Sequence, residues 1–129
     1  MKKLSRKHLI IISLVLLTTT VFISACTKKT GYGQKTTTTT TTTITQVKVK
    51  DILSKAYTGK DVSIEGKITL ECGSGCWFNL EDGTGKVYVD LLPSNFAIPQ
   101  WVGKSVVVNG KVLEEDGEVK VIAKGVTLK

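Results

Sequence analysis

Apolar and polar residues alternate along most of the chain after residue 60. The alternation runs through five segments, 61–72, 76–81, 86–92, 105–114 and 118–128. A period of two residues is typical of strands that bury one face. We therefore predict five strands over these ranges. Two stretches rich in Asp and Gly, 82–85 and 115–117, are predicted to be the turns between neighbouring strands.

The parity of each strand also predicts which side chains face the core. The inward set is Val62, Ile64, Ile68, Leu70, Cys72, Cys76, Phe78, Leu80, Val87, Val89 and Leu91. Gly66 falls on the inward face of the first strand, where we expect a bend or bulge.

Two other elements interrupt the strand pattern. Residues 49–56 place Ile52, Leu53 and Ala56 on one face, which predicts a short helix. The segment 93–104, PSNFAIPQWVGK, is bounded by prolines and a glycine. We expect a short helical turn or loop there, with Phe96 and Trp101 covering one end of the core.

Three strands, a connecting element and two further strands is the element order of an OB-fold barrel. The stretches VKVKDIL, GKDVSIEGKI, CGSGCWFNLEDGTGKVYVD and VGKSVVVNGKV resemble small exported OB-fold proteins of the nucleic-acid-binding-like and anticodon-binding-like group. The resemblance implies an all-β, five-stranded Greek-key barrel with a short N-terminal helix. It says more about fold than about activity, because one fold serves many functions.

The N-terminal 26 residues carry a different pattern. A basic start, MKKLSRKH, precedes fifteen uncharged residues, 9–23, a run too short for a permanent membrane span. Ile23-Ser24-Ala25-Cys26 then resembles the lipobox of bacterial lipoprotein precursors. That resemblance implies a signal peptide over 1–25 and acyl chains, such as palmitate, on Cys26. An uncleaved anchor with an incidental cysteine is the alternative.

Residues 26–46 are expected to form a linker between the lipidated cysteine and the barrel domain at 47–129. Eight consecutive threonines, 36–43, form a polar low-complexity run that cannot bury enough apolar surface to order itself. A flexible chain of 19 residues spans roughly 25 Å. We expect a disordered tether, and the sequence leaves open whether it carries sugars.

Charge narrows the choice of partners. The chain has a formal net charge of +7, but seven of its eighteen cations lie before residue 46, and all eleven acids lie after it. The domain therefore balances eleven lysines against eleven acids. Phosphate binding depends on cation density, so nucleic acid is not the expected partner. The expected partners are the membrane, an envelope protein and a glycan.

Cys72 and Cys76 stand on either side of Gly-Ser-Gly, at the end of one predicted strand and the start of the next. Facing positions of a hairpin lie within the distance that a disulfide requires, and export favours oxidation. We therefore predict a hairpin disulfide. A zinc site, a catalytic redox pair and a thiol or soft-metal sensor are the alternatives, but zinc needs about four ligands and the domain has no histidine.

The outward face of the second and third strands is the candidate ligand surface, since OB folds commonly bind there. Its side chains are Trp77, Asn79, Lys86, Tyr88 and Asp90. Aromatic rings in this position could stack on bases or sugars. Alternatively, Trp77 packs beneath the linker or the helix.

We find no catalytic set, metal site or cofactor motif, because the only histidine, His8, lies in the predicted signal peptide. The sequence predicts a non-enzymatic binding module for a protein, glycan or small molecule, anchored by lipid to the cell membrane or outer membrane and outside the cytoplasm. Thr27, rather than aspartate, after the lipidated cysteine favours the outer membrane in a two-membrane host. Envelope redox or metal handling through Cys72 and Cys76, and oligonucleotide binding, are the alternative functions.

Overall fold

A computed structural model describes residues 30–33 and 44–129 of the 129-residue chain. The elements are β1 (Gly31–Gly33), β2 (Thr45–Gln46), α2 (Val49–Leu53), β3 (Asp61–Glu71), β4 (Trp77–Glu81), β5 (Lys86–Asp90), η1 (Leu92–Ser94), β6 (Ser105–Glu115) and β7 (Glu118–Leu128). The predicted signal peptide and the threonine run lie outside the described residues, so they stay predictions.

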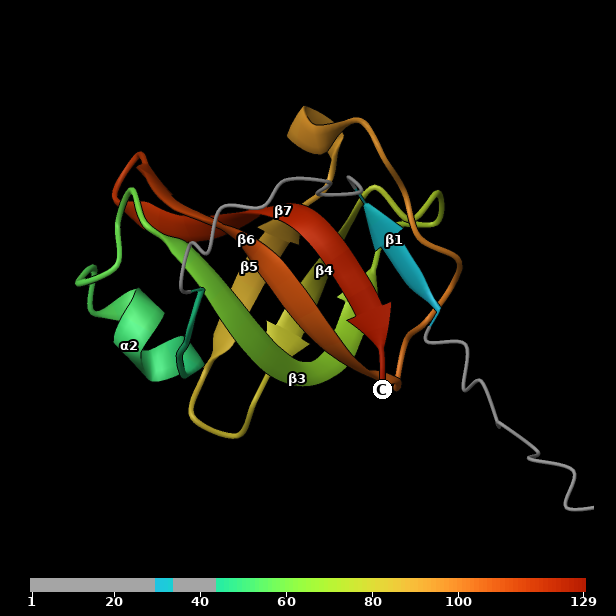
Figure 1. Cartoon of the computed structure of the whole chain (residues 1–129), viewed down its shortest axis with the longest axis horizontal. Helices are drawn as coiled ribbons and strands as arrows, with labels where there is room; N and C mark the ends of the chain where they lie inside the picture. Colours follow the sequence, from blue (N-terminus) through green and yellow to red (C-terminus); the bar gives the residue numbers. More distant parts are fainter. Residues whose placement is uncertain (1–29, 34–43) are drawn as a thin grey trace, which may run out of the picture.

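Strands β3 to β7 close into a five-stranded barrel (Figure 1). β3 pairs with β4, β4 with β5, and β5 with β7 in parallel, while β6 pairs antiparallel with both β7 and β3. The ring order β3-β4-β5-β7-β6 matches the predicted Greek-key barrel. The predicted strand ranges agree with the observed ones to within two residues at every end.

The β6–β7 hairpin shows how local sequence sets this geometry. Asp116 and Gly117 have φ values of 53° and 85°. Two successive residues with positive φ form the turn whose twist matches a two-residue hairpin, and Asp-Gly is a favoured pair for it. The turn is thus two residues long, one shorter than the predicted 115–117.

The buried core is aliphatic apart from Phe78, which is fully buried, and Trp101, which is 8% exposed. The predicted inward side chains are buried there, with three exceptions: Leu70 and the two cysteines beside the hairpin. Val49 and Ile52 of α2 are also fully buried and close one end of the barrel. The helix is three residues shorter than predicted, because the chain turns after Leu53 and Lys55 takes a φ of 65°.

Leu70 was predicted to face the core, but it is 52% exposed. The cause is a register shift between Ile68 and Leu70 in the β3–β4 ladder, since one extra residue reverses the side-chain parity. Gly66, where we expected a bend or bulge, carries no bulge in its pairing with β6, because it pairs regularly with Val106. A side chain at Gly66 would lie 2.6 Å from the Glu81 carbonyl oxygen, so close strand approach explains the glycine.

The predicted linker is not wholly separate from the barrel. β1 pairs antiparallel with Gly125–Thr127 of β7, and β2 pairs in parallel with β3. The described parts of the 26–46 segment therefore add short strands to the barrel, which a uniformly disordered tether would not do. Neither piece shows apolar alternation, so the sequence pattern did not indicate this pairing.

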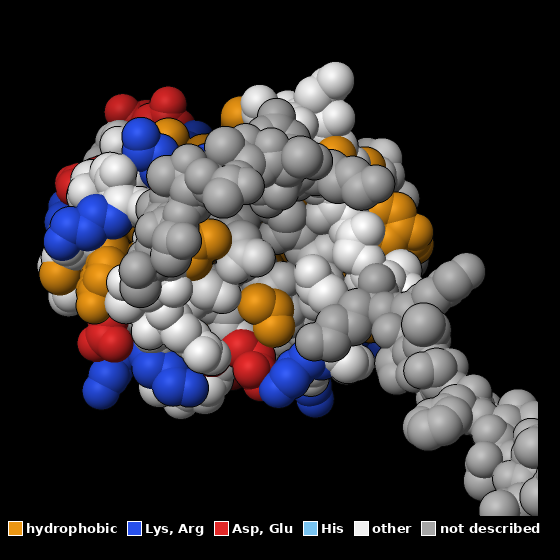
Figure 2. Space-filling view, viewed as in Figure 1, with side chains coloured by type: hydrophobic (Ala, Val, Ile, Leu, Met, Phe, Trp, Pro, Cys, Tyr) orange, Lys and Arg blue, Asp and Glu red, His pale blue; other side chains and the backbone are white. Residues whose placement is uncertain are grey.

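No helix among residues 30–33 and 44–129 is long and apolar enough to cross a membrane. In the view of Figure 2, lysine and acidic side chains are interspersed around the margin of the described surface rather than gathered by sign. This distribution agrees with the balanced charge of the domain.

Candidate functional site

The candidate ligand surface lies on β4 and β5, beside the turn of the β6–β7 hairpin. Antiparallel pairing sets Asn79 opposite Tyr88, and Tyr88 pairs on its other side with Lys120 of β7. Side chains on the outer face of these three strands are therefore near neighbours.

An aromatic pair stands on this face. The rings of Trp77 and Tyr88 have centroids 5.4 Å apart and planes inclined by 30°. Their strands hold them in diagonal positions, so the pair needs no loop to form. Tyr88 is 37% exposed, which leaves part of its ring open to a ligand. Trp77 is half-buried.

A groove of about 420 Å³ opens beside Tyr88. We call it the β4–β5 groove. It is lined by Leu53, Lys55, Asn79, Lys86, Tyr88, Gly117, Glu118 and Val119. Three of the five predicted ligand residues thus share one concavity. OB folds commonly bind ligands on this strand face next to the hairpin that corresponds to β6–β7.

Asp90 does not join the groove. It pairs with Trp77 in the ladder, and its carboxylate accepts a hydrogen bond from the Leu92 N–H at 3.1 Å. That bond holds the start of η1, so we assign Asp90 a structural role. The sequence pattern did not indicate the other five lining residues. They belong to α2, to the turn after it and to the β6–β7 hairpin, which come next to the groove only when the barrel closes.

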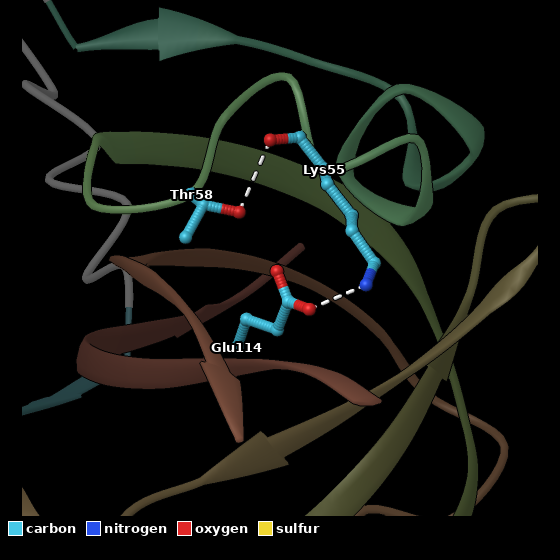
Figure 3. Close-up of polar contacts among 3 residues, drawn as sticks. All are labelled: Lys55, Thr58 and Glu114. Atoms are coloured by element: carbon cyan, nitrogen blue, oxygen red, sulfur yellow. Dashed lines mark hydrogen bonds and ion pairs between the residues drawn. The ribbon is translucent and has the colours of Figure 1, made fainter. Parts of the chain in front are cut away.

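Two ion pairs lie at or beside the groove. The Lys55 ammonium pairs with Glu114, and Figure 3 shows the link between the α2–β3 connection and β6. The Lys55 carbonyl also accepts a hydrogen bond from the Thr58 hydroxyl at 3.1 Å. Lys120 pairs with Glu115; that contact lowers the pKa of Glu115 and raises the pKa of Lys120.

Burial raises the pKa of Tyr88, and the nearby Asp90 carboxylate raises it further, against the smaller opposite influence of Lys120. The phenol therefore keeps its proton at neutral pH and can donate one hydrogen bond. Beside it the groove offers an amide from Asn79, an ammonium from Lys86 and a carboxylate from Glu118. The arrangement suits binding through stacking and hydrogen bonds.

Asp82, in the β4–β5 turn, holds the N-terminus of α2. Its carboxylate accepts hydrogen bonds from the Val49 N–H at 3.0 Å and from the backbone and hydroxyl of Thr84 at 2.8 and 2.6 Å. Desolvation raises the pKa of Asp82, but these hydrogen bonds and Lys48 together lower it below its ordinary value. Asp82 thus satisfies the first N–H of α2 in place of a capping residue.

Cys72 and Cys76 form the predicted disulfide, with Cα atoms 5.8 Å apart. They lie in the turn, one residue beyond each strand, rather than facing each other in the ladder. The turn packs against the β5–β6 connection. Ile98 donates its N–H to the Gly75 carbonyl at 3.1 Å, and Gln100 donates to the Cys72 and Gly73 carbonyls.

The contact at Gly75 is so close that a side chain there would meet the Ile98 carbonyl oxygen at 1.8 Å. Nearby, the backbone N–H of Trp101 donates to the Glu71 carboxylate at 2.7 Å. The disulfide therefore shapes a turn that holds the Trp101 segment in place. Residues 30–33 and 44–129 contain no cluster of three or more metal-ligating side chains.

A second groove, of about 310 Å³, has no aromatic wall. It is lined by Gln46, Lys48, Glu65, Gly66, Lys67, Glu81, Asp82 and Ser105. Charged groups of both signs face each other there, and Asp82 is already bonded to α2 and Thr84. The β4–β5 groove is the better candidate of the two because it joins an aromatic surface to polar groups.

Solved structures place this barrel among known folds. Asparaginyl-tRNA synthetase from Pyrococcus horikoshii matches with a TM-score of 0.51 and 19% identity, over 64% of this chain and 22% of the synthetase. The strand order and this match agree. The barrel is an OB fold. The chain spans about a fifth of the synthetase, whose activity belongs to that whole protein.

Two further structures match at a lower TM-score of 0.49. The hypothetical protein YgiW from E. coli is 15% identical over 67% of this chain and 97% of YgiW. The Stn1–Ten1 complex from S. pombe is 16% identical over 64% of this chain and 75% of the matched chain. No protein-family model and no curated protein matches the sequence.

Proposed function

We propose that this OB-fold protein is a non-enzymatic binding module of the bacterial cell envelope and that an uncharged carbohydrate chain occupies its β4–β5 groove. A lipid on Cys26 holds it at the membrane with the barrel outside the cytoplasm. The observation that carries the ligand class is the joining of the Trp77–Tyr88 pair to a groove that carries both signs of charge and in which Lys55 is already paired with Glu114.

Sugar rings have an apolar face and a polar rim. The exposed part of Tyr88 offers an apolar surface to the ring face. Asn79, Lys86 and Glu118 offer donors and acceptors to hydroxyl and acetamido groups. A few placed polar groups beside an aromatic wall is the usual composition of a small-ligand site.

The charges argue against an oligonucleotide at the same face. Lys55 is paired with Glu114 and Lys120 with Glu115, and the Lys86 ammonium shares the groove with the Glu118 carboxylate. An oligonucleotide would bring further negative charge to a surface with no excess of cations. An uncharged chain meets no such repulsion.

The disulfide supports a binding role over redox handling. Both neighbours of the bonded pair contribute to packing, through Gly75 against Ile98 and through Glu71 to Trp101. A structural staple explains these contacts, whereas a redox centre commonly has its thiolate activated at the N-terminus of a helix, and the helices of the described residues, α2 and η1, are only five and three residues long.

A titration of the full chain tests the ligand. Tetra-N-acetylchitotetraose serves as the uncharged probe and an eight-residue oligo-dT as the charged one, with tryptophan emission and calorimetry as readouts. We expect the sugar to bind and the oligonucleotide not to bind at low salt. Binding of oligo-dT alone, or of neither probe, would overturn the carbohydrate assignment.

Two tyrosines of nearly equal exposure provide a matched control. Tyr88 is 37% exposed and Tyr32 is 38% exposed, but only Tyr88 lines the groove. Tyr88→Ala should weaken sugar binding at least about fivefold, because stacking on one aromatic ring contributes about 1–3 kcal/mol. Tyr32→Ala should leave the dissociation constant unchanged.

The anchor needs its own test. Intact mass of the protein extracted from membranes should show acyl chains on a chain that begins at Cys26. Cys26→Ser should instead release the protein from the detergent phase into the aqueous phase. Recovery of wild-type protein in the aqueous phase would contradict the lipid anchor.

A further inference from the structure

The strand β1, which we call the strap, occupies a specific site on the barrel. β6 pairs with one edge of β7 along its whole length, whereas β5 pairs with the other edge only at Lys120–Ile122. The strap takes up that second edge further along β7, pairing Gly31–Gly33 with Gly125–Thr127. The Leu128 N–H extends the pairing with a bond to the Thr30 carbonyl at 3.0 Å.

A side-chain contact fixes the register of the strap. The Tyr32 ring meets the Trp101 ring edge-on, with centroids 5.3 Å apart and planes inclined by 71°. Trp101 is only 8% exposed and its backbone is held by Glu71, so Tyr32 docks on a rigid surface. Such aromatic pairs contribute about 0.5–1.5 kcal/mol beyond their burial.

Backbone shape makes the site selective for glycine at the end of the strap. Gly33 has a φ of 128°, and a side chain there would lie 2.4 Å from the Lys124 carbonyl oxygen. The site therefore accepts a Gly-Tyr-Gly segment: a flat backbone for strand pairing and one aromatic ring for Trp101.

We propose that docking of the strap orients the anchored barrel, so that the Trp101 end faces the membrane and the β4–β5 groove faces away from it. This inference rests on the proposed lipid at Cys26. Thr30 follows Cys26 by only four positions, and four residues span at most about 14 Å. A docked strap thus holds the end of β7 near Leu128 close to the bilayer.

The groove lies at the opposite end of β7. Tyr88 pairs with Lys120, eight residues before Leu128. Eight residues of strand extend about 26 Å. Figure 1 shows the same arrangement, with β1 at one side of the barrel and α2, whose Leu53 lines the groove, at the other. A ligand outside the bilayer therefore reaches the groove without passing between protein and membrane.

Release of the strap would lengthen and loosen the link between Cys26 and the barrel. The chain between Cys26 and β2 would then act as one tether of about 18 residues, with a root-mean-square span of roughly 23 Å in place of a short fixed link. The barrel would tumble on it. Docking therefore decides whether the groove has one orientation or many.

Gly33→Ala tests the docking, because the added methyl group has no room beside Lys124 and Gly125. Gly59→Ala is the matched control, since Gly59 also has a positive φ, of 80°, but has no atom within 4 Å of the added carbon. Hydrogen exchange on the full chain is the readout. Gly33→Ala should speed exchange of the Leu128 amide at least tenfold, while Lys120–Ile122 stay protected in both variants.

Neutron reflectometry on bilayers carrying the lipidated protein tests the orientation. We expect a thin, well-defined protein layer next to the headgroups for wild type and Gly59→Ala, and a thicker, more diffuse layer for Gly33→Ala. Equal layers for wild type and Gly33→Ala, or an unprotected Leu128 amide in wild type, would overturn the inference. Failure of any layer to form would overturn the lipid anchor, and the exchange experiment, which needs no lipid, would report the docking separately.

Discussion

Two aromatic pairs stand at opposite ends of β7, and they differ in how they are built. Trp77 and Tyr88 belong to paired neighbouring strands and lie with tilted, partly open rings. Tyr32 and Trp101 are 69 residues apart in sequence and meet edge to face, with Trp101 almost buried. The first pair presents a surface, whereas the second joins two segments. The difference shows that aromatic content alone does not separate a binding surface from a structural contact.

The largest expected effect comes from removing each tryptophan in turn. Trp101→Ala should lower the free energy of unfolding by about 3–5 kcal/mol, because it empties a buried site. Trp77→Ala should cost much less, about 1 kcal/mol, since its ring lies on the outer face. Urea denaturation of both variants measures the contrast. Equal losses would contradict the distinction between a structural contact, Tyr32–Trp101, and an exposed binding surface, Trp77–Tyr88.

Removing the disulfide should have the next largest effect on stability. Its local effects should be confined to the end of the barrel where Trp101 lies. Replacing Cys72 and Cys76 together by serine should lower the free energy of unfolding by about 2 kcal/mol, the lower part of the usual range, because the closed loop is short. Exchange of the Ile98 amide should rise, since the Gly75 carbonyl that it bonds would move. Sugar binding at Tyr88 should stay unchanged, and a loss of it would show that the two ends are coupled.

A smaller effect is expected at the N-terminus of α2, from Asp82→Asn. The substitution removes the carboxylate that holds Val49 and Thr84, at a cost of about 0.5–1 kcal/mol in this open site. Because the folded pKa lies below the unfolded value of about 3.8, the stabilisation is complete above that pH. It is lost as the pH falls through the folded pKa. Urea titrations of wild type and variant should therefore differ at pH 7 and converge in strong acid.

The smallest effect is spectroscopic. The Tyr88 phenol should ionise above the ordinary tyrosine pKa of about 10, because of burial and the Asp90 carboxylate. Ultraviolet difference spectra of wild type and Tyr88→Phe should isolate this step at alkaline pH. A Tyr88 step below pH 10 would contradict the described surroundings of the ring.

The sequence predicts the barrel better than its surface. Alternation places β6 and β7 almost to the residue, and Asp116-Gly117 marks their turn. Both signals are local. The exposure of Leu70 follows from a register shift, which depends on how two strands meet and leaves no mark in the alternation.

The residues of the candidate site also fall into those that the sequence pattern indicates and those that it does not. Asn79, Lys86 and Tyr88 share an outward parity, so the pattern finds them, but Leu53 and Glu118 reach the groove only when the barrel closes. Asp90 shares that parity too, yet its carboxylate is bonded to Leu92. The docking of Gly31–Gly33 is harder still to foresee, because three residues carry no periodicity and their partner lies more than 90 residues away.

The strap has one more consequence, for proteins crowded side by side on a surface. Unpaired strand edges invite neighbouring chains to add their own strands, and aggregates grow by that route. Three residues of strap cover Gly125–Thr127, on the edge of β7 that β5 occupies only at Lys120–Ile122. A short, glycine-bounded segment thereby removes part of an edge through which copies of the barrel could otherwise pair.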